Sequence, residues 1–217
     1  MQNELILQYL NEERIEDLKK KIAEEIYEKE LKKSIGASAA KRYAAMKRYF
    51  KYSDKNKDAR LIYPCTNVRV NTWGKEAVYN CFCDSYTFVM TNENIGELTD
   101  YRSVKDNDYF DFSRIFSNAE KESGIVDLSS VLAKAKAKGY RLKKKEYTDF
   151  AYAWKYKDAY FKVGLLDLAF AIINDGNKVK VHYTDPGSIM IIETSIGFAG
   201  ILPFYRSDAS NKIIIIE

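Results

Sequence analysis

Apolar residues recur at steps of three and four through residues 3–33, with charged residues between them. This spacing places the apolar side chains on one face of a helix. We therefore predict one long helix over residues 3–33. Gly36 is expected to end it, because glycine readily adopts the backbone conformation that follows a helix. Ser38 is a suitable N-cap for a second predicted helix over residues 39–50.

The pattern changes at Leu61, where runs rich in β-branched and aromatic residues begin. Two such runs, residues 61–73 and 76–91, flank Gly74 and predict a hairpin. Polar and acidic residues dominate residues 92–124, and we interpret this region as mainly loop.

The last part of the chain alternates between helical and strand patterns. Residues 126–139 predict a short helix that ends at Gly139, and residues 146–163 alternate aromatic and polar side chains at strand spacing. Residues 164–175 predict an apolar helix closed by Gly176. Three strands follow at residues 178–184, 188–194 and 198–205, joined by glycine-containing turns. Helices followed by strands, twice in succession, predict the α+β class.

The C-terminal part of this pattern resembles the DNA sliding clamp (processivity clamp) family. Residues 161–206 follow the order of the clamp's terminal half-domain: Leu165, Leu166 and Asp167 match its "YLLDAL" helix motif, and Leu202, Pro203 and Arg206 match its final apolar-Pro-apolar-Arg pattern. Upstream, "CDSYTFVM" at residues 83–90 is similar to the family's "TDGYRLA" turn. The resemblance implies a clamp-like fold in which a helix plus an antiparallel meander occurs twice.

The resemblance also implies a domain organisation. Residues 37–217 would form one clamp-like domain, with half-repeats at about 37–105 and 140–210 and a polar, acidic insertion at about 92–127. Residues 1–36 would be a helical extension. A bacterial clamp chain has three such domains, so a ring of this chain would require self-assembly through edge strands. Clamp helices face DNA with basic residues, and only the helix over residues 39–51 fits that role.

Charge is strongly segregated along the chain, although the net charge is only +4. Residues 41–60 carry eight Lys and Arg against two Asp, residues 128–147 carry seven against one Glu, and residues 84–127 carry ten acidic residues against four basic ones. Such segregation can create a basic face that binds nucleic acid. The alternative interpretation is that these are solvated helix surfaces. The candidate nucleic-acid-binding residues are Lys41, Arg42, Lys47, Arg48, Lys134, Lys136, Lys138, Arg141, Lys143, Lys144 and Lys145.

The run "AKAKAKGYRLKKK" at residues 133–145 is the most basic part of the second segment. Lysines at every second position cannot all share one helix face, so a helix here would be basic nearly all round and exposed. Binding of phosphates by these lysines would be salt-sensitive and independent of nucleotide sequence. Tyr140 and Tyr147 suggest stacking on single strands. Pairing of the lysines with acidic residues of the same chain is the alternative.

The residue types that catalysis requires are sparse. The only histidine, His182, alternates with Lys178 and Lys180, so we expect it on the polar face of its strand, at the surface. Cys81 and Cys83 are expected to be buried thiols rather than zinc ligands. Acidic pairs such as Asp106 and Asp108 could bind a divalent ion, but solvated loop acids are commoner. We therefore expect no catalytic residues, no metal, no cofactor and no enzymatic activity.

The sequence also bears on location. No run of 18 apolar residues exists, which predicts no membrane span, and the N-terminus lacks the apolar core of a signal peptide. An odd number of cysteines, three, favours a reducing compartment. We predict a cytoplasmic protein.

Two apolar segments require partners. The tail "NKIIIIE" would be an aggregation-prone edge if exposed, so it is expected to pair into a sheet, pack on the N-terminal helix or meet another chain, with burial in the same chain favoured. The stripe of Ile15, Leu18, Ile22 and Ile26 is expected to pack within the chain or on a second copy. Both are candidate oligomer contacts.

These observations support a leading hypothesis and two rivals. The leading one is a non-enzymatic, clamp-like accessory or adaptor protein in DNA metabolism, encoded by a phage or mobile element, with DNA, replication or repair proteins as partners. The first rival is a protein–protein interaction module that uses the N-terminal helix and binds no nucleic acid. The second is an enzyme whose site is assembled from dispersed loop acids.

Overall fold

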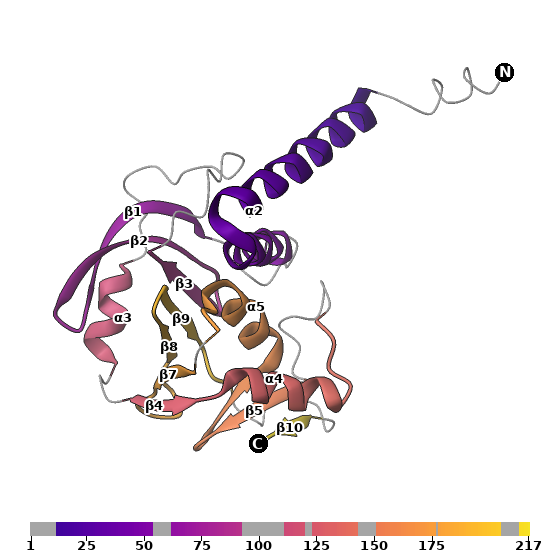
Figure 1. Ribbon diagram of the computed structural model, residues 1–217. Coiled ribbons are helices and arrows are strands. Elements are labelled where there is room, and N and C mark those ends of the chain that lie inside the picture. Colours follow the sequence, from indigo (N-terminus) through magenta and orange to yellow (C-terminus); the bar gives the residue numbers. More distant parts are fainter. Residues whose placement is uncertain are drawn as a thin grey trace. The chain divides into compact units, whose positions relative to one another are not determined.

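The computed structural model describes residues 12–53, 62–92, 111–119, 123–142, 151–176, 178–204 and 213–217 (Figure 1). The chain divides into two compact units, residues 1–41 and 42–217. The helices are α2 (Glu12–Ser53), α3 (Phe112–Asn118), α4 (Leu128–Ala137) and α5 (Val163–Ile173). The strands are β1 (Ile62–Thr72), β2 (Lys75–Cys83), β3 (Thr87–Thr91), β4 (Ser123–Val126), β5 (Tyr152–Tyr156), β6 (Ala159–Lys162), β7 (Val179–His182), β8 (Met190–Thr194), β9 (Gly197–Ile201) and β10 (Ile214–Ile216).

The first unit consists of the N-terminal part of α2. Its helical conformation is interrupted at Gly36, where φ is 88° and ψ is 161°. A side chain at this φ would be strained, which explains the glycine and confirms the predicted end of the first helix. Ile15, Leu18, Ile22 and Ile26 are between 37% and 52% exposed. Packing of this stripe, within the chain or on a second copy, stays a prediction.

The second unit is built on a seven-stranded sheet with the order β1-β2-β3-β9-β8-β7-β4, in which all neighbours are antiparallel. Two three-stranded meanders, β1-β2-β3 and β7-β8-β9, meet where β3 pairs with β9. Each meander follows a helix in the chain, α2 or α5. These elements confirm the α+β class and place the three predicted C-terminal strands in one sheet.

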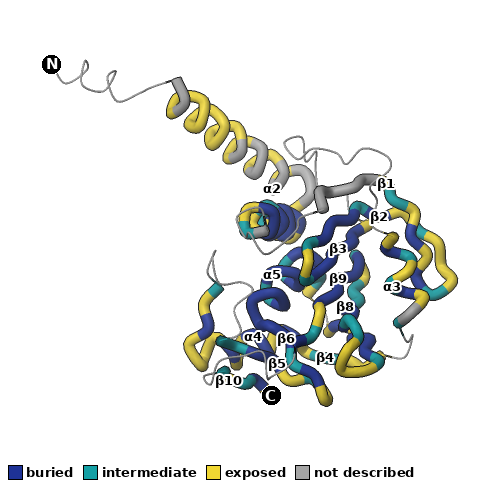
Figure 2. Tube along the Cα trace, turned by 180° about the vertical axis from the view of Figure 1, so that it is seen from behind, coloured by how far each residue is buried: buried dark blue, intermediate teal, exposed yellow. Residues whose placement is uncertain are grey.

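One face of this sheet is covered by helices. The rings of Tyr49 and Phe50 in α2 pack on Phe82 of β2, with ring centroids 5.1 and 4.8 Å away. Helix α5 contacts β3 and β9 on one side, and α4, β5 and β6 on the other. It is consequently buried along most of its length (Figure 2). Burial explains why α5 is apolar and carries no basic residue.

The opposite face of the sheet packs on α3. Phe112 and Phe116 of α3 are 2% and 1% exposed and contact the ring of Phe88 in β3. Helix α3 begins after Asp111, whose carboxylate accepts a hydrogen bond from the Ser113 N–H at 3.1 Å. The loop prediction for residues 92–124 missed this helix. Its signals were the Asp111 cap and apolar residues at helical spacing, but they span only two turns.

The C-terminal tail forms part of a second, three-stranded sheet with the order β10-β5-β6. Strand β10 pairs in parallel with β5, and Ile216 is fully buried. This confirms that the isoleucine tail pairs into a sheet of its own chain, although Ile214 is 38% exposed. Cys81 and Cys83 are buried thiols, as predicted.

Candidate functional site

The exposed side of the last three turns of α2 carries three basic residues: Lys47, Arg48 and Lys51. At about 100° per residue these side chains fall within about 100° of arc, roughly opposite the buried stripe of Met46, Tyr49 and Phe50. Arg48 and Lys51 are exposed, and the half-buried Lys47 lies with its ammonium 5.4 Å from the centroid of the Tyr43 ring. We call this set the α2 basic ridge.

Both ends of the segment that carries the ridge are attached near α5. Arg42 is 8% exposed, and its guanidinium donates to the carbonyl of Asn174, just beyond the end of α5, at 3.5 Å. At the other end Tyr52 acts electrostatically on Tyr140 and contributes to the raised pKa of its hydroxyl. Tyr140 in turn donates to the carboxylate of Asp167 in α5 at 3.2 Å.

Tyr140 lies just beyond the end of α4 and bonds that part of the chain to α5. Burial, and then the Asp167 carboxylate, raise the pKa of Tyr140, so its hydroxyl stays protonated as a donor. The side chain is 5% exposed, which leaves its ring face unavailable for stacking on a nucleobase.

The lysines of α4 have a structural role that the sequence did not predict. Lys134 donates to the main-chain oxygen of Glu217 at 2.7 Å, and Lys138 donates to that of Ile215 at 2.8 Å. They thereby hold β10 beside the helix. Arg141 donates to the carbonyls of Lys136 and Tyr140 at 3.1 and 2.7 Å, at the end of its own helix. Lys134, Lys136, Lys138 and Arg141 are all exposed as expected, although Ala135 in the same helix is fully buried.

The other predicted residues are placed as follows. Lys41 is exposed and belongs to the first unit, whereas Arg42 is buried and used within the fold. Lys143, Lys144, Lys145 and Tyr147, and the acidic pair Asp106 and Asp108, lie outside the described residues.

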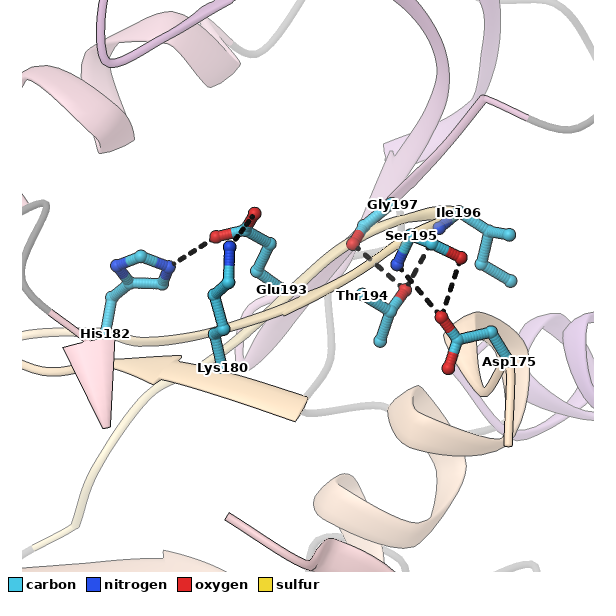
Figure 3. Close-up of polar contacts among 8 residues, drawn as sticks. All are labelled: Asp175, Lys180, His182, Glu193, Thr194, Ser195, Ile196 and Gly197. Atoms are coloured by element: carbon cyan, nitrogen blue, oxygen red, sulfur yellow. Dashed lines mark hydrogen bonds and ion pairs between the residues drawn. The ribbon is translucent and has the colours of Figure 1, made fainter. Parts of the chain in front are cut away.

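The sequence did not predict the burial of His182. The prediction of a surface position is wrong: the ring is 3% exposed, with Nε2 at 2.8 Å from the Glu193 carboxylate (Figure 3). Lys180 donates to the other carboxylate oxygen of Glu193 at 3.2 Å. His182 and Lys180 do share one face of β7, as alternation requires. However, the indole of Trp73 covers the histidine, with the ring centroids 4.2 Å apart.

Trp73 reaches His182 from the turn between β1 and β2. Both residues of this turn, Trp73 and Gly74, have left-handed φ values of 50° and 87°. The conformation suits glycine but costs a tryptophan about 1–3 kcal/mol. Contacts of the indole offset this cost: Nε1 donates to the Ala119 carbonyl at 2.9 Å, and the ring packs edge-on against Phe116 at 4.9 Å. Trp73 thus attaches the tip of the hairpin to the rest of the second unit.

A pocket of about 180 Å³ lies beside this contact. It is smaller than the roughly 300–1,000 Å³ typical of drug-sized ligand sites. Its lining residues are Thr72, Trp73, Lys75, Ser123, Lys180, His182, Glu193 and Phe198. Nearby, Asp175 accepts hydrogen bonds from the N–H and the hydroxyl of Ser195 at 3.0 and 2.7 Å, which fixes the β8–β9 turn (Figure 3).

Within the described part of the chain, no group of three or more His, Cys, Asp and Glu side chains could hold a metal ion. Among the same residues, no helix combines the length and apolar character needed to cross a membrane. Comparison with protein-family models, with curated proteins and with solved structures gave no match.

Proposed function

We propose that this protein is a non-enzymatic, clamp-like accessory or adaptor protein of DNA metabolism that binds nucleic acid through the α2 basic ridge. The observation that carries the proposal is the position of Lys47, Arg48 and Lys51 on the exposed side of a helix whose other side is anchored in the core. Cations held on a rigid helix can contact successive phosphates without sequence preference.

The arrangement of the sheet supports the clamp-like part of the proposal. Its two helix-plus-meander halves, joined by the β3–β9 pair, have the order that the resemblance to sliding clamps implies. The proposal does not include two DNA-facing helices, because α5 is buried and has no basic residue. It also leaves Arg42 and Tyr140 out of the interface, since both are buried and bonded to α5 or its end.

The second candidate function is a protein–protein interaction module. The observation that favours it is the exposed stripe of Ile15, Leu18, Ile22 and Ile26 on the first unit. Leaving four such side chains in water is unfavourable, because full burial of each is worth about 1.5–3 kcal/mol. Light scattering of the chain with and without residues 1–33 tests this function, since loss of self-association on deletion would assign the contact to the helix.

Replacement of Lys47, Arg48 and Lys51 together by glutamine tests the leading function. We expect DNA to bind at least about tenfold more weakly, a loss of about 1.4 kcal/mol or more. The slope of log K against log salt should fall by about three if each side chain contacts one phosphate of duplex DNA. The melting temperature should hardly change, because exposed charges contribute about 0–1 kcal/mol each to stability. Titration of labelled DNA at several salt concentrations measures both quantities.

The matched control replaces three exposed lysines outside the ridge by glutamine: Lys75, Lys155 and Lys178. It removes the same number of charges, so equal weakening by both triple variants would show that net charge, and not the ridge, determines binding. Absence of DNA binding by the wild-type chain at low salt would leave the interaction-module function.

A further inference from the structure

A cavity of about 380 Å³ lies between helix α3 and the turn that joins β1 to β2. Its volume is near the lower end of the roughly 300–1,000 Å³ range of small-molecule sites, which suits a small ligand. The cavity is independent of the proposed function, because α2 and α3 pack on opposite faces of the seven-stranded sheet. Side chains of the turn and of the α3 region contribute to its lining: Asn71, Trp73, Asp111, Arg114 and Phe116.

The aromatic part of the lining comes from Trp73, at a position that the local backbone disfavours for this residue. A two-residue hairpin turn with left-handed φ at both positions usually carries Asn-Gly. Here Trp73 and Gly74 have φ values of 50° and 87°. Strained backbone of this kind is concentrated at ligand sites and other functional positions. The half-buried indole meets the ring of Phe116 edge to face, with the centroids 4.9 Å apart, so the two rings give the cavity an aromatic wall.

Two side chains of opposite charge line the same cavity. The backbone N–H of Arg114 donates to the carbonyl of Asp111 at 3.2 Å, so the two residues lie one helical turn apart. Side chains at this spacing have Cβ atoms about 5–6 Å apart. Both are exposed, and neither forms an ion pair, with the other or with a further residue, in the part of the chain that the structure describes. One carboxylate oxygen of Asp111 accepts from the Ser113 N–H, which leaves the other oxygen and the guanidinium for a ligand.

A cation, an anion and an aromatic wall together match a ligand that carries the same three features. We propose that this cavity binds a small aromatic zwitterion of the class of the free aromatic amino acids, with its carboxylate on Arg114, its ammonium on Asp111 and its ring against Trp73. A guanidinium can bind a carboxylate through two parallel hydrogen bonds. The two charged groups of an amino acid share one carbon atom, so they can reach two side chains that lie one helical turn apart.

The remaining polar group and the charge balance agree with this ligand. The Asn71 amide oxygen accepts from the Gly74 N–H at 2.7 Å, which fixes the amide at the cavity and leaves its two N–H donors for the ligand carboxylate. A nucleotide would bring a phosphate with a charge of about −1.5 to −2. That charge would meet one cation and be repelled by Asp111, whereas a zwitterion is neutral overall and satisfies both residues.

Nuclear magnetic resonance of the full-length chain tests the proposal with L-phenylalanine as the probe. We expect saturable shifts of the amide resonances of residues 71–74 and 111–117 and of the Trp73 indole N–H. The indole N–H of Trp154, the only other tryptophan in the sequence, should stay unchanged. Phenethylamine lacks the carboxylate and hydrocinnamate lacks the ammonium, so each should bind about tenfold more weakly. No saturable shift with millimolar L-phenylalanine, or tighter binding of adenosine monophosphate, would overturn the proposal.

Two substitutions connect each charged group of the ligand to its residue. Arg114→Gln should weaken binding of L-phenylalanine about tenfold. It should leave binding of phenethylamine unchanged, because that analogue has no carboxylate. Asp111→Asn retains a good helix cap, and it should weaken L-phenylalanine to a similar degree while leaving hydrocinnamate unchanged.

Lys75→Gln is the matched control. Lys75 is exposed and follows the same turn, but it lines the neighbouring pocket beside His182, so L-phenylalanine should bind as before. Equal weakening by Lys75→Gln and Arg114→Gln would overturn the proposal, because net charge alone would then determine binding. An equal effect of Arg114→Gln on phenethylamine would also overturn it. Should a variant fail to fold, the three ligands on the wild-type chain still decide.

Discussion

Replacing Gly200 by alanine is expected to lower the free energy of unfolding by about 3 kcal/mol, the upper range for overpacking a core. Gly200 lies in β9, the strand where the two meanders join, and is the cross-strand partner of Phe88. A Cβ atom at this position would lie 1.9 Å from Cε1 of Phe88 and 2.8 Å from Cδ1 of Ile189. The Phe88 ring cannot easily move aside, because the rings of Phe112 and Phe116 lie 6.0 and 6.2 Å away. Urea unfolding measures the loss.

Two further variants test the cause of this loss. Gly124 lies on the edge strand β4. In Gly124→Ala the added Cβ would meet only the hydroxyl of Tyr156, at 3.0 Å. Its stability should stay within about 1 kcal/mol of the wild type. Combining Gly200→Ala with Phe88→Leu should be less destabilising than the sum of the single changes, because the smaller side chain makes room for the methyl group. Additive losses would show that the contact with Phe88 is not responsible.

The predictable parts of the fold are those determined by local pattern. Gly36 was recognisable as a helix end and Gly74 as a turn because few other residues adopt their left-handed φ values of 88° and 87°. The apolar spacing of α5 and the strands that follow it was similarly clear. Helix α3 was missed because Phe112, Ile115 and Phe116 fill only two turns, and so short a segment reads equally well as loop.

The candidate sites depend on contacts between segments that are distant in sequence. Alternation correctly placed His182 on the face of Lys180, but no local rule predicts that Trp73 covers the ring from another hairpin. Likewise, the charge of Lys134 and Lys138 was evident, whereas their acceptors, the main-chain oxygens of Glu217 and Ile215, became apparent only from the folded chain. The α2 basic ridge was predictable because the exposed and the buried face of α2 both follow from the periodicity of one helix.

Replacing Phe82 by alanine is expected to have the largest effect, a loss of about 3–5 kcal/mol in the free energy of unfolding. Phe82 is fully buried in β2, and its ring packs on Tyr49 and Phe50, on the buried side of α2 opposite the basic ridge. Its removal leaves a cavity directly beneath that helix, so amides in residues 42–53 should exchange faster than those in α5. Urea unfolding and hydrogen exchange of the folded variant measure the two effects.

Val78 provides the matched control for Phe82, because both lie on β2 and alternation places them on the same face of the sheet. Val78 is 49% exposed, and Val78→Ala should cost less than about 1 kcal/mol. A double-mutant cycle between Phe82→Ala and Phe50→Ala should give a coupling energy of about 0.5–3 kcal/mol, as expected for rings 4.8 Å apart. Zero coupling, with equal losses for Phe82→Ala and Val78→Ala, would mean that α2 is not anchored through Phe82. The rigid presentation of Lys47, Arg48 and Lys51, on which nucleic-acid binding is proposed to depend, would then lack the support of Phe82.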